Sequence, residues 1–155
     1  ENQTISQPFI VAFMTENLEL KPRHKVLEIG TGSGFQTAVL SKLADLVVSV
    51  EINEVLAKKA SIRLNQLGYS NISLHHSDGI QGISKYAPYD RILVSAASDK
   101  IPKKLFDQLS INGQMIIPIG KQSEVQHLWL IKKMKDGEIK KEKILPVHFA
   151  SIIKG

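Results

Sequence analysis

The stretch VLEIGTGSGFQTAVL (26–40) decides how this chain folds, because its character changes twice within a few residues. An apolar run typical of a buried strand ends at Ile29, glycines alternate through GTGSG, and a helix-like segment follows. This order is typical of open parallel α/β sheets, in which ligands bind at the carboxyl ends of the strands. The simpler interpretation is a tight turn, but three alternating glycines exceed what a turn needs, since glycine also lets a ligand approach the backbone closely.

Outward from this stretch, apolar patterning predicts alternating strands and helices through the first two thirds of the chain. Asn53 is expected to cap one helix and Gly68 to end it, and Asn112-Gly113 is expected to form the turn before the fifth strand. The predicted strands are 25–29, 46–50, 72–76, 91–95 and 114–119, and the predicted helices are 9–20, 36–43, 54–67 and 102–109.

The last third predicts an antiparallel hairpin. Asp136-Gly137, a strong hairpin signal, separates the strand-like runs HLWLIKKM (127–134) and EIKKEKILPV (138–147). The fold class is therefore α/β, a mostly parallel central sheet flanked by helices, with an antiparallel C-terminal hairpin. No internal repeat or second domain is visible, so residues 1–155 are expected to form a single domain.

Composition limits the partners of this domain. The 155 residues contain no cysteine, which excludes thiolate chemistry, and we expect no metal site. No apolar run approaches the length that spans a bilayer and no signal peptide is visible, so we expect a cytoplasmic protein without a membrane partner. We also expect a monomer. The net charge of +5 permits a nucleic-acid partner. Many lysines, however, lie in 132–143, where blocking edge-to-edge strand pairing is the favoured role, and we expect no nucleic acid.

The glycine loop does not fit two common nucleotide sites. A dinucleotide fingerprint needs G-x-G-x-x-G, but the sixth position is Phe35 counted from Gly30 and Thr37 counted from Gly32. A P-loop needs a lysine at the helix start, and there is none from Thr31 to Ser41. NAD is therefore disfavoured and ATP binding by a P-loop is excluded.

Acidic residues at three strand ends point to a different ligand. Glu28 lies just before the glycines, where a carboxylate repels pyrophosphate and favours an ammonium or sulfonium group. Glu51 ends the second strand, where a carboxylate accepts hydrogen bonds from ribose hydroxyls. Asp78-Gly79 follows the third strand, within reach of an adenine amino group. A nucleoside with a cationic amino-acid tail and no phosphate satisfies all three, and S-adenosylmethionine is such a molecule.

The glycine loop, Glu51 and HSDG (76–79) together resemble class I methyltransferases, which have a Rossmann-like fold. The resemblance implies that the cofactor is S-adenosylmethionine, with S-adenosylhomocysteine as product. The cofactor-binding residues predicted from this set are Glu28, Gly30, Thr31, Gly32, Ser33, Gly34, Glu51, Asp78 and Gly79.

The methyl acceptor is narrowed by what the sequence lacks. Cytosine-C5 methylation needs a cysteine, and SAASDKIP (95–102) lacks the Asn/Asp-Pro-Pro-aromatic motif typical of amide or base nitrogen methylation. A neutral hydroxyl acceptor needs a base near pKa 7, but none of the five histidines lies in an obvious catalytic context. A carboxylate acceptor is already ionised at pH 7 and needs only alignment and desolvation.

The stretch QTISQPFIVAFM (3–14) resembles the protein-L-isoaspartate O-methyltransferase family. Further matching stretches are the glycine loop, 67–79, APYDRILVSAAS (87–98), NGQMIIPIG (112–120) and LPVHF (145–149). The resemblance implies Ser6 as the active-site residue, with Gln3, Thr4 and Ile5 on a loop that also touches the cofactor. It also implies methylation of the α-carboxyl of L-isoaspartyl residues in damaged proteins, followed by collapse to a succinimide.

Alternatives stay open at this point. Ser6, just before Pro8, also suits a helix cap, and both roles are compatible because capping uses a lone pair and orientation uses the proton. Another acceptor such as RNA, or a truncated cofactor-binding remnant, are the other functions considered. The family carries a helical segment of several tens of residues before QTIS, which we expect to be missing here, and the tail FASIIKG (149–155) departs from the family's ending, so no site residues are assigned to it.

Overall fold

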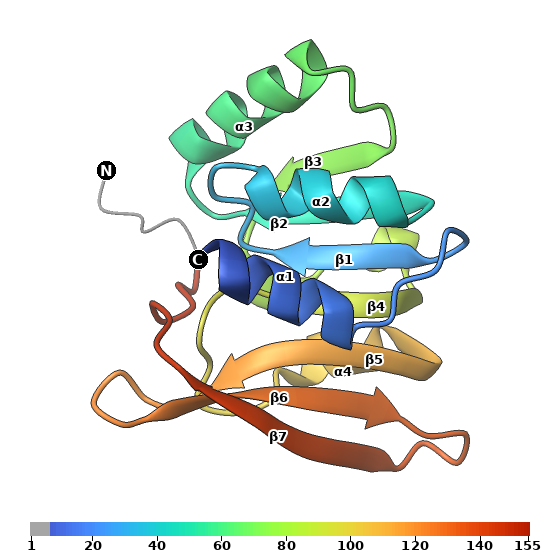
Figure 1. The fold of residues 1–155 in the computed structure, drawn as a ribbon, viewed down its shortest axis with the longest axis vertical. Helices are drawn as coiled ribbons and strands as arrows, with labels where there is room; N and C mark the ends of the chain where they lie inside the picture. Colours follow the sequence, from blue (N-terminus) through green and yellow to red (C-terminus); the bar gives the residue numbers. More distant parts are fainter. Residues whose placement is uncertain (1–6) are drawn as a thin grey trace.

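The apolar runs of the sequence pair into one seven-stranded sheet in the computed structural model, which describes residues 7–155 (Figure 1). Its order across the sheet is β3-β2-β1-β4-β5-β6-β7. The strands are β1 (Lys25–Ile29), β2 (Leu46–Glu51), β3 (Ile72–His76), β4 (Tyr89–Val94), β5 (Leu109–Ile119), β6 (Gln126–Lys133) and β7 (Ile139–Val147).

Strand direction divides the sheet into two parts. Neighbours from β3 through to β5 pair in parallel, whereas β6 runs antiparallel to β5 and β7 antiparallel to β6. The chain moves from β1 outward to β3 and then returns to place β4 on the other side of β1. Ligands in open α/β sheets bind where the strand order reverses in this way, at the carboxyl ends of the strands.

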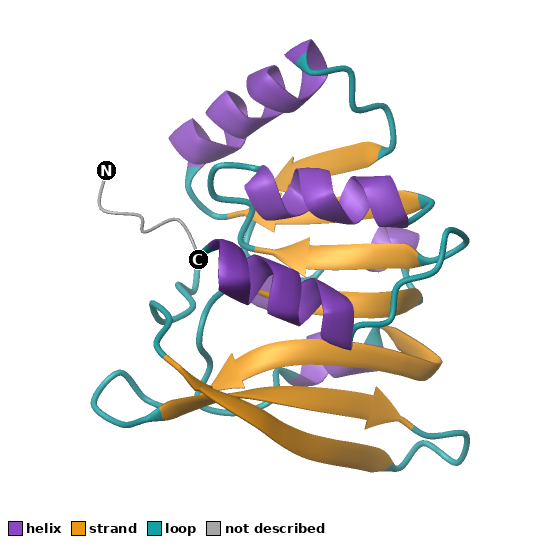
Figure 2. Cartoon of the chain, in the orientation of Figure 1, coloured by secondary structure: helices purple, strands orange, loops and turns teal. Residues whose placement is uncertain are grey.

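Helices cover both faces of the sheet (Figures 1 and 2). The helices α1 (Pro8–Asn17), α2 (Phe35–Leu43) and α3 (Glu54–Gln66) lie on one face. The short helix α4 (Lys103–Asp107) and the 3₁₀ turns η1 (Gly79–Gln81) and η2 (Ser84–Tyr86) belong to the other. None of the described helices is long and apolar enough to cross a membrane.

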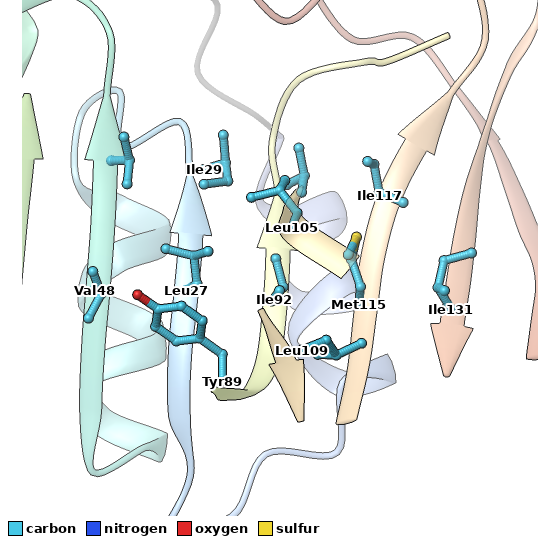
Figure 3. Close-up of a cluster of buried hydrophobic side chains, with 12 residues drawn as sticks. Leu27, Ile29, Val48, Tyr89, Ile92, Leu105, Leu109, Met115, Ile117 and Ile131 are labelled. Atoms are coloured by element: carbon cyan, nitrogen blue, oxygen red, sulfur yellow. The ribbon is translucent and has the colours of Figure 1, made fainter. Parts of the chain in front are cut away.

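The core on the α4 side explains why the central strands are nearly continuous apolar runs. Leu27 and Ile29 of β1 meet Ile92 of β4, Met115 and Ile117 of β5 (Figure 3). The alternate residues of the same strands, such as Val26, Leu93 and Ile116, pack with α1 and α2 on the opposite face. A strand buried on both faces is therefore a nearly continuous apolar run, as is typical of parallel α/β sheets.

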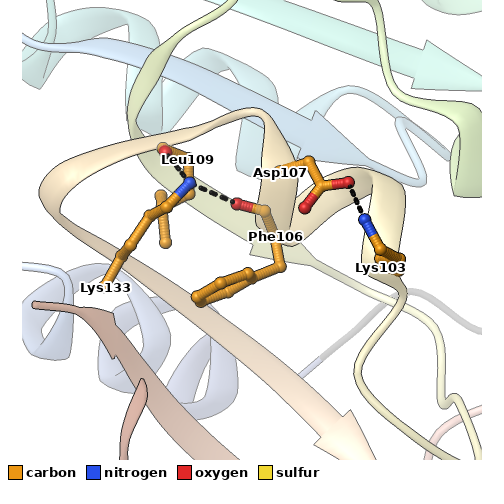
Figure 4. Close-up of polar contacts among 5 residues, drawn as sticks. All are labelled: Lys103, Phe106, Asp107, Leu109 and Lys133. Carbon is orange, nitrogen blue, oxygen red and sulfur yellow. Dashed lines mark hydrogen bonds and ion pairs between the residues drawn. The ribbon is translucent and has the colours of Figure 1, made fainter. Parts of the chain in front are cut away.

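Polar contacts fix the five-residue helix α4 against the antiparallel part of the sheet (Figure 4). The Nζ atom of Lys133, on β6, donates to the carbonyl oxygens of Phe106 (3.2 Å) and Leu109 (2.9 Å). Lysine near a helix C-terminus satisfies carbonyls that have no partner inside the helix. Lys103 pairs with Asp107 across one turn, at 2.6 Å, on the exposed side.

The predicted fold class is confirmed, as are the hairpin around Asp136-Gly137 and the cap at Asn53, whose side chain accepts from the amide of Leu56. The lysine-rich strand β7 is the edge of the sheet. One prediction was wrong. The sequence Asn112-Gly113 does not precede the fifth strand but lies inside β5, where the pairing with β4 shifts from Tyr89–Leu109 to Arg91–Gln114. Asn112 has a φ of 64°, so the expected turn is a bulge within one longer strand.

Several element ends also differ from the predictions. The first helix ends at Asn17 rather than at 20, because Leu18 is its C-cap and Glu19 has a left-handed φ of 49°. The helix predicted at 102–109 ends at Asp107, because Leu109 already belongs to β5. The fourth strand begins two residues early, at Tyr89, and ends at Val94.

Candidate active site

A cleft of about 670 Å³ opens at the carboxyl ends of the central strands, where the strand order reverses. Its walls come from the glycine loop after β1, the end of β2, the segment after β4 and the chain after β7, with α1 contributing from the sheet face. The lining residues are Gln7, Ile10, Val11, Ile29–Ser33, Phe35, Gln36, Val50–Ile52, Gly79, Ser95, Ala96, Gln122 and Pro146–Ile153. This volume is in the range of sites for small molecules and cofactors.

The glycine loop forms one wall of the cleft because its backbone adopts left-handed conformations. Gly30 and Gly32 have φ values of 95° and 53°, which residues with a Cβ rarely adopt. The amide of Gly30 donates to the carbonyl of Val50 at 2.8 Å, which ties the start of the loop to β2. Thr31 and Ser33 also line the cleft, and their role in cofactor binding stays a prediction.

Gly34 was expected to face the ligand with the rest of the loop, but it lies outside the cleft. Its φ of 88° makes it the N-cap of α2, and a Cβ there would lie 3.4 Å from the side chain of Leu64 on α3. The glycine therefore serves the turn into the helix and its packing on α3.

Glu51 joins the glycine loop to the end of β2. Its side chain is only 3% exposed, and it lines the cleft. The Oε2 atom accepts from the amide of Gly32 at 2.8 Å, and Oε1 accepts from the amide of Asn53 at 3.0 Å. Each carboxylate oxygen has a second lone pair, so Glu51 retains acceptor capacity for hydroxyl groups of a ligand.

Glu28 does not face the cleft, contrary to the prediction that it meets a cationic ligand. Its side chain is completely buried beneath the loop, on the part of β1 that pairs with Ser49 of β2. The Oε1 atom accepts from Thr37 Oγ1 at 2.5 Å and from Ser49 Oγ at 2.6 Å. Thr31 Oγ1 lies 2.6 Å from Ser49 Oγ, so this hydroxyl network reaches the loop itself.

Burial changes the protonation of Glu28. Desolvation, with a smaller contribution from the carboxylate of Glu51, raises its pKa to about 7 against the opposing hydrogen bonds from Ser49 and Thr37. Its Oε2 atom has no hydrogen-bond partner among the described residues. Glu28 is thus a buried group that titrates near neutral pH and supports the loop through Thr37, Ser49 and Thr31.

Of the predicted residues Asp78 and Gly79, only Gly79 lines the cleft. Its lack of a side chain is required, because a Cβ would lie 2.4 Å from Cγ2 of Ile29. Asp78 lies beside the wall and caps η1, since its Oδ1 accepts from the amide of Ile80 at 3.0 Å. Its Oδ2 accepts from the amide of Gly155 at 3.3 Å. The expected contact of Asp78 with adenine stays a prediction.

Four predicted site residues, Gln3, Thr4, Ile5 and Ser6, lie outside the described residues. Gln7, the first residue that the structure describes, lines the cleft next to Ile10 and Val11. The roles predicted for the motif stay predictions.

Sequence reasoning missed the wall formed by the chain after β7 and by the segment after β4. Ser95 and Ala96 directly follow β4, which pairs with β1. Their position at the end of a strand was the sequence signal that could have identified them as cleft residues. His148 also lines the cleft, although no histidine was expected there. Residues 149–153 are held by long-range contacts rather than by a regular helix or strand. Their sequence therefore has no periodicity that would reveal their position. Among residues 7–155, no cluster of three or more potential metal ligands is present.

Known proteins resemble this chain over almost its whole length. The family model for protein-L-isoaspartate(D-aspartate) O-methyltransferase matches residues 1–155. The chain is 49% identical over 150 residues to protein-L-isoaspartate O-methyltransferase 2 of a Polaromonas species, covering 97% of this chain and 71% of that protein. It is 46% identical to the Gloeobacter violaceus enzyme, covering 97% and 73%, and 46% identical to a Cupriavidus necator enzyme, of which it covers 58%.

Solved structures agree in fold. A protein-L-isoaspartate O-methyltransferase structure superposes with a TM-score of 0.90 at 35% identity, and the match covers 97% of this chain but only 49% of that one. A Plasmodium falciparum structure assigned to the same enzyme, in complex with S-adenosyl-L-homocysteine, gives a TM-score of 0.83 at 28% identity, covering 100% and 78%. The chain belongs to the protein-L-isoaspartate (D-aspartate) O-methyltransferase family, as the resemblance of its motifs predicted.

Proposed function

We propose that this chain transfers a methyl group from S-adenosylmethionine to the α-carboxyl of L-isoaspartyl residues in damaged proteins. The observation that carries the proposal is the cleft at the reversal of strand order, built by the motif residues of a chain that belongs to this family. The Polaromonas and Gloeobacter relatives carry the same enzyme name.

The residues of the cleft fit the cofactor. Glu51 offers a carboxylate with free acceptor capacity for ribose hydroxyls, and the backbone of Gly30–Ser33 is open to close approach. No lysine or arginine lines the described part of the cleft, so no such side chain there pairs with a phosphate. The Plasmodium falciparum relative binds S-adenosyl-L-homocysteine, the product of methyl donation. When bound, S-adenosylmethionine supplies an electrophilic methyl group on a positively charged sulfur.

The described walls also suit a carboxylate acceptor. A carboxylate is ionised at pH 7 and needs no general base, so the protein has to align it and exclude water. Apolar side chains, including Ile10, Val11 and Ile152, line much of the cleft beside the hydroxyls of Ser95 and Ser151. An apolar surrounding favours a transfer in which the negative charge of the carboxylate and the positive charge of the sulfonium cancel.

The positive charge of the chain gives no support to an RNA acceptor. The lysines of 132–143 lie at the end of β6, in the following turn and in the first half of β7. This turn is at the far end of the hairpin from Pro146 and Val147, which line the cleft (Figure 1). We therefore retain no nucleic acid among the proposed partners, and we propose that the enzyme acts as a monomeric cytoplasmic protein with residues 1–155 as one catalytic domain.

Mass spectrometry of peptide products tests the proposal. An isoaspartyl peptide incubated with the chain and S-adenosylmethionine is expected to gain one methyl group and then yield the succinimide and the aspartyl isomer. A short RNA incubated in parallel is expected to stay unmodified. Methylation of the RNA without methylation of the peptide would replace the proposed acceptor.

Replacing Ser6 by alanine tests the active-site role that the family resemblance implies. We expect Ser6→Ala to lower kcat by about tenfold or more, since a hydrogen bond to a charged group contributes about 1.5–3 kcal/mol. The dissociation constant of S-adenosylmethionine should change by less than about twofold. Ser123→Ala, at an exposed loop position, is the control. Wild-type turnover in Ser6→Ala would leave the residue with a capping role alone.

A further inference from the structure

The segment after β7 forms a wall of the cleft without belonging to a long strand. Residues 148–153 pass from the end of the hairpin toward the central strands. A single parallel bridge joins Ser151 to Ala97. The amide of Ala97 donates to the carbonyl oxygen of Ala150, and the amide of Ile152 donates to the carbonyl oxygen of Ala97, both at 2.8 Å. So short a ladder leaves the path of the segment dependent on other contacts.

A buried glutamine holds the start of this segment. The side chain of Gln126 is completely buried at the first position of β6. Its Oε1 atom accepts from the amide of Phe149 at 2.6 Å, and its Nε2 atom donates to the carbonyl oxygen of Phe149 at 3.1 Å. Both polar ends of one side chain therefore pair with the main chain of one residue, as a neighbouring strand would. Gln122 Nε2 donates to the same carbonyl, at 2.5 Å.

The surroundings leave this clamp little freedom. Gln126 pairs with Val147, so its backbone fixes the last residue of β7 and its side chain fixes the chain two residues later. A Cβ on Gly120 would lie 3.0 Å from Cα and 3.1 Å from Cγ of Gln126, so the glutamine is packed against the backbone of the preceding loop. The ring of Phe149 is buried in the core with Leu128, so the residue is held by both its main chain and its side chain.

We propose that Gln126 is a positioning residue for the methylation reaction, acting on the acceptor side of the cleft through residues 148–153. This inference rests on the proposed function, but Gln126 is outside the cleft lining and touches neither reactant. Its neighbours along the clamp, His148 and Ala150, do line the cleft. On the cofactor side, Glu51 fixes the glycine loop through the amide of Gly32, and the tail reaches Asp78 only through Gly155, beyond residues 148–153. Loss of the clamp therefore affects the peptide more than the cofactor.

Gln126→Met tests this role, because methionine keeps the length of the side chain and removes both hydrogen bonds without burying a charge. We expect the KM for an isoaspartyl peptide to rise about tenfold or more. Both kcat and the dissociation constant of S-adenosylmethionine should stay within about twofold. Gln114→Met, the same exchange on β5 outside the cleft, is the matched control and should leave the KM unchanged.

Hydrogen exchange provides a second readout that does not depend on activity. In Gln126→Met, the amides of Phe149 and Ile152 should lose protection while those of β1 and β4 keep it. Unchanged protection at Phe149, or an equal loss of protection through the whole sheet, would overturn the positioning role. If the wild-type chain methylates no peptide, the proposed function fails, and the exchange data still decide whether Gln126 holds the cleft wall.

Discussion

Glu51→Ala is expected to weaken the binding of S-adenosylmethionine by about 100-fold, equivalent to about 2.7 kcal/mol. Two effects contribute. The variant loses a charged acceptor for ribose hydroxyls, and hydrogen bonds to charged groups contribute about 1.5–3 kcal/mol each. It also releases the amides of Gly32 and Asn53, which Glu51 holds at 2.8 and 3.0 Å, so the glycine loop is less well ordered. Isothermal titration calorimetry measures the change directly.

Two further variants separate these contributions. Glu51→Gln keeps an oxygen acceptor but loses the charge, so an intermediate loss of about tenfold is expected. Glu54→Ala removes a nearby carboxylate that is exposed and paired with Lys58, and its affinity should equal that of the wild type. Unchanged affinity in Glu51→Ala would show that the cofactor does not use this carboxylate.

Glu28 should make the stability of the fold depend on pH in the direction opposite to that of most carboxylates. Its pKa rises from 4.5 to about 7 in the folded protein because of burial. The folded state therefore binds the proton more tightly than the unfolded state, and the free energy of unfolding falls as pH rises between these values. A shift of this size corresponds to about 3 kcal/mol, fully present below pH 4.5 and lost as pH passes through about 7.

Urea unfolding of the wild type and of Glu28→Gln at several pH values between 4 and 8 measures this effect. Glutamine resembles the protonated acid and still accepts from Thr37 and Ser49, so the variant should lack the pH dependence. The other titrating groups cancel in the difference between the two proteins. We expect the wild type to lose about 3 kcal/mol relative to Glu28→Gln across this range. Parallel curves would mean that Glu28 does not retain a proton when folded.

Local patterns predicted most of the fold, because each depends on neighbouring residues alone. The strands at 25–29 and 72–76 are found within the predicted bounds, and Asp136-Gly137 forms the expected hairpin turn. The Asn112-Gly113 pair misled the prediction, because the same residues suit a turn and a bulge, and only pairing with β4 distinguishes them.

The site was predicted less completely, for reasons of geometry. The motif places Glu28 next to the glycines, but the pleat of β1 turns its side chain under the loop, and sequence spacing does not reveal that face. Gly34 belongs to the same motif, but it lies at the start of α2 and packs near Leu64 of α3 rather than lining the cleft. Residues 148–153 reach the cleft through the buried amide of Gln126 and the bridge to Ala97, and such long-range contacts leave no periodic signal.

Methyl transfer from labelled S-adenosylmethionine to two peptides that differ only in one isoaspartyl or aspartyl residue tests the central claim most directly. The enzyme has to distinguish the position of one carboxylate, so the pair controls for every other property of the acceptor. We predict label in the isoaspartyl peptide and only background label in the aspartyl peptide. Equal labelling of both peptides, or no labelling of either while the cofactor binds, would contradict the account.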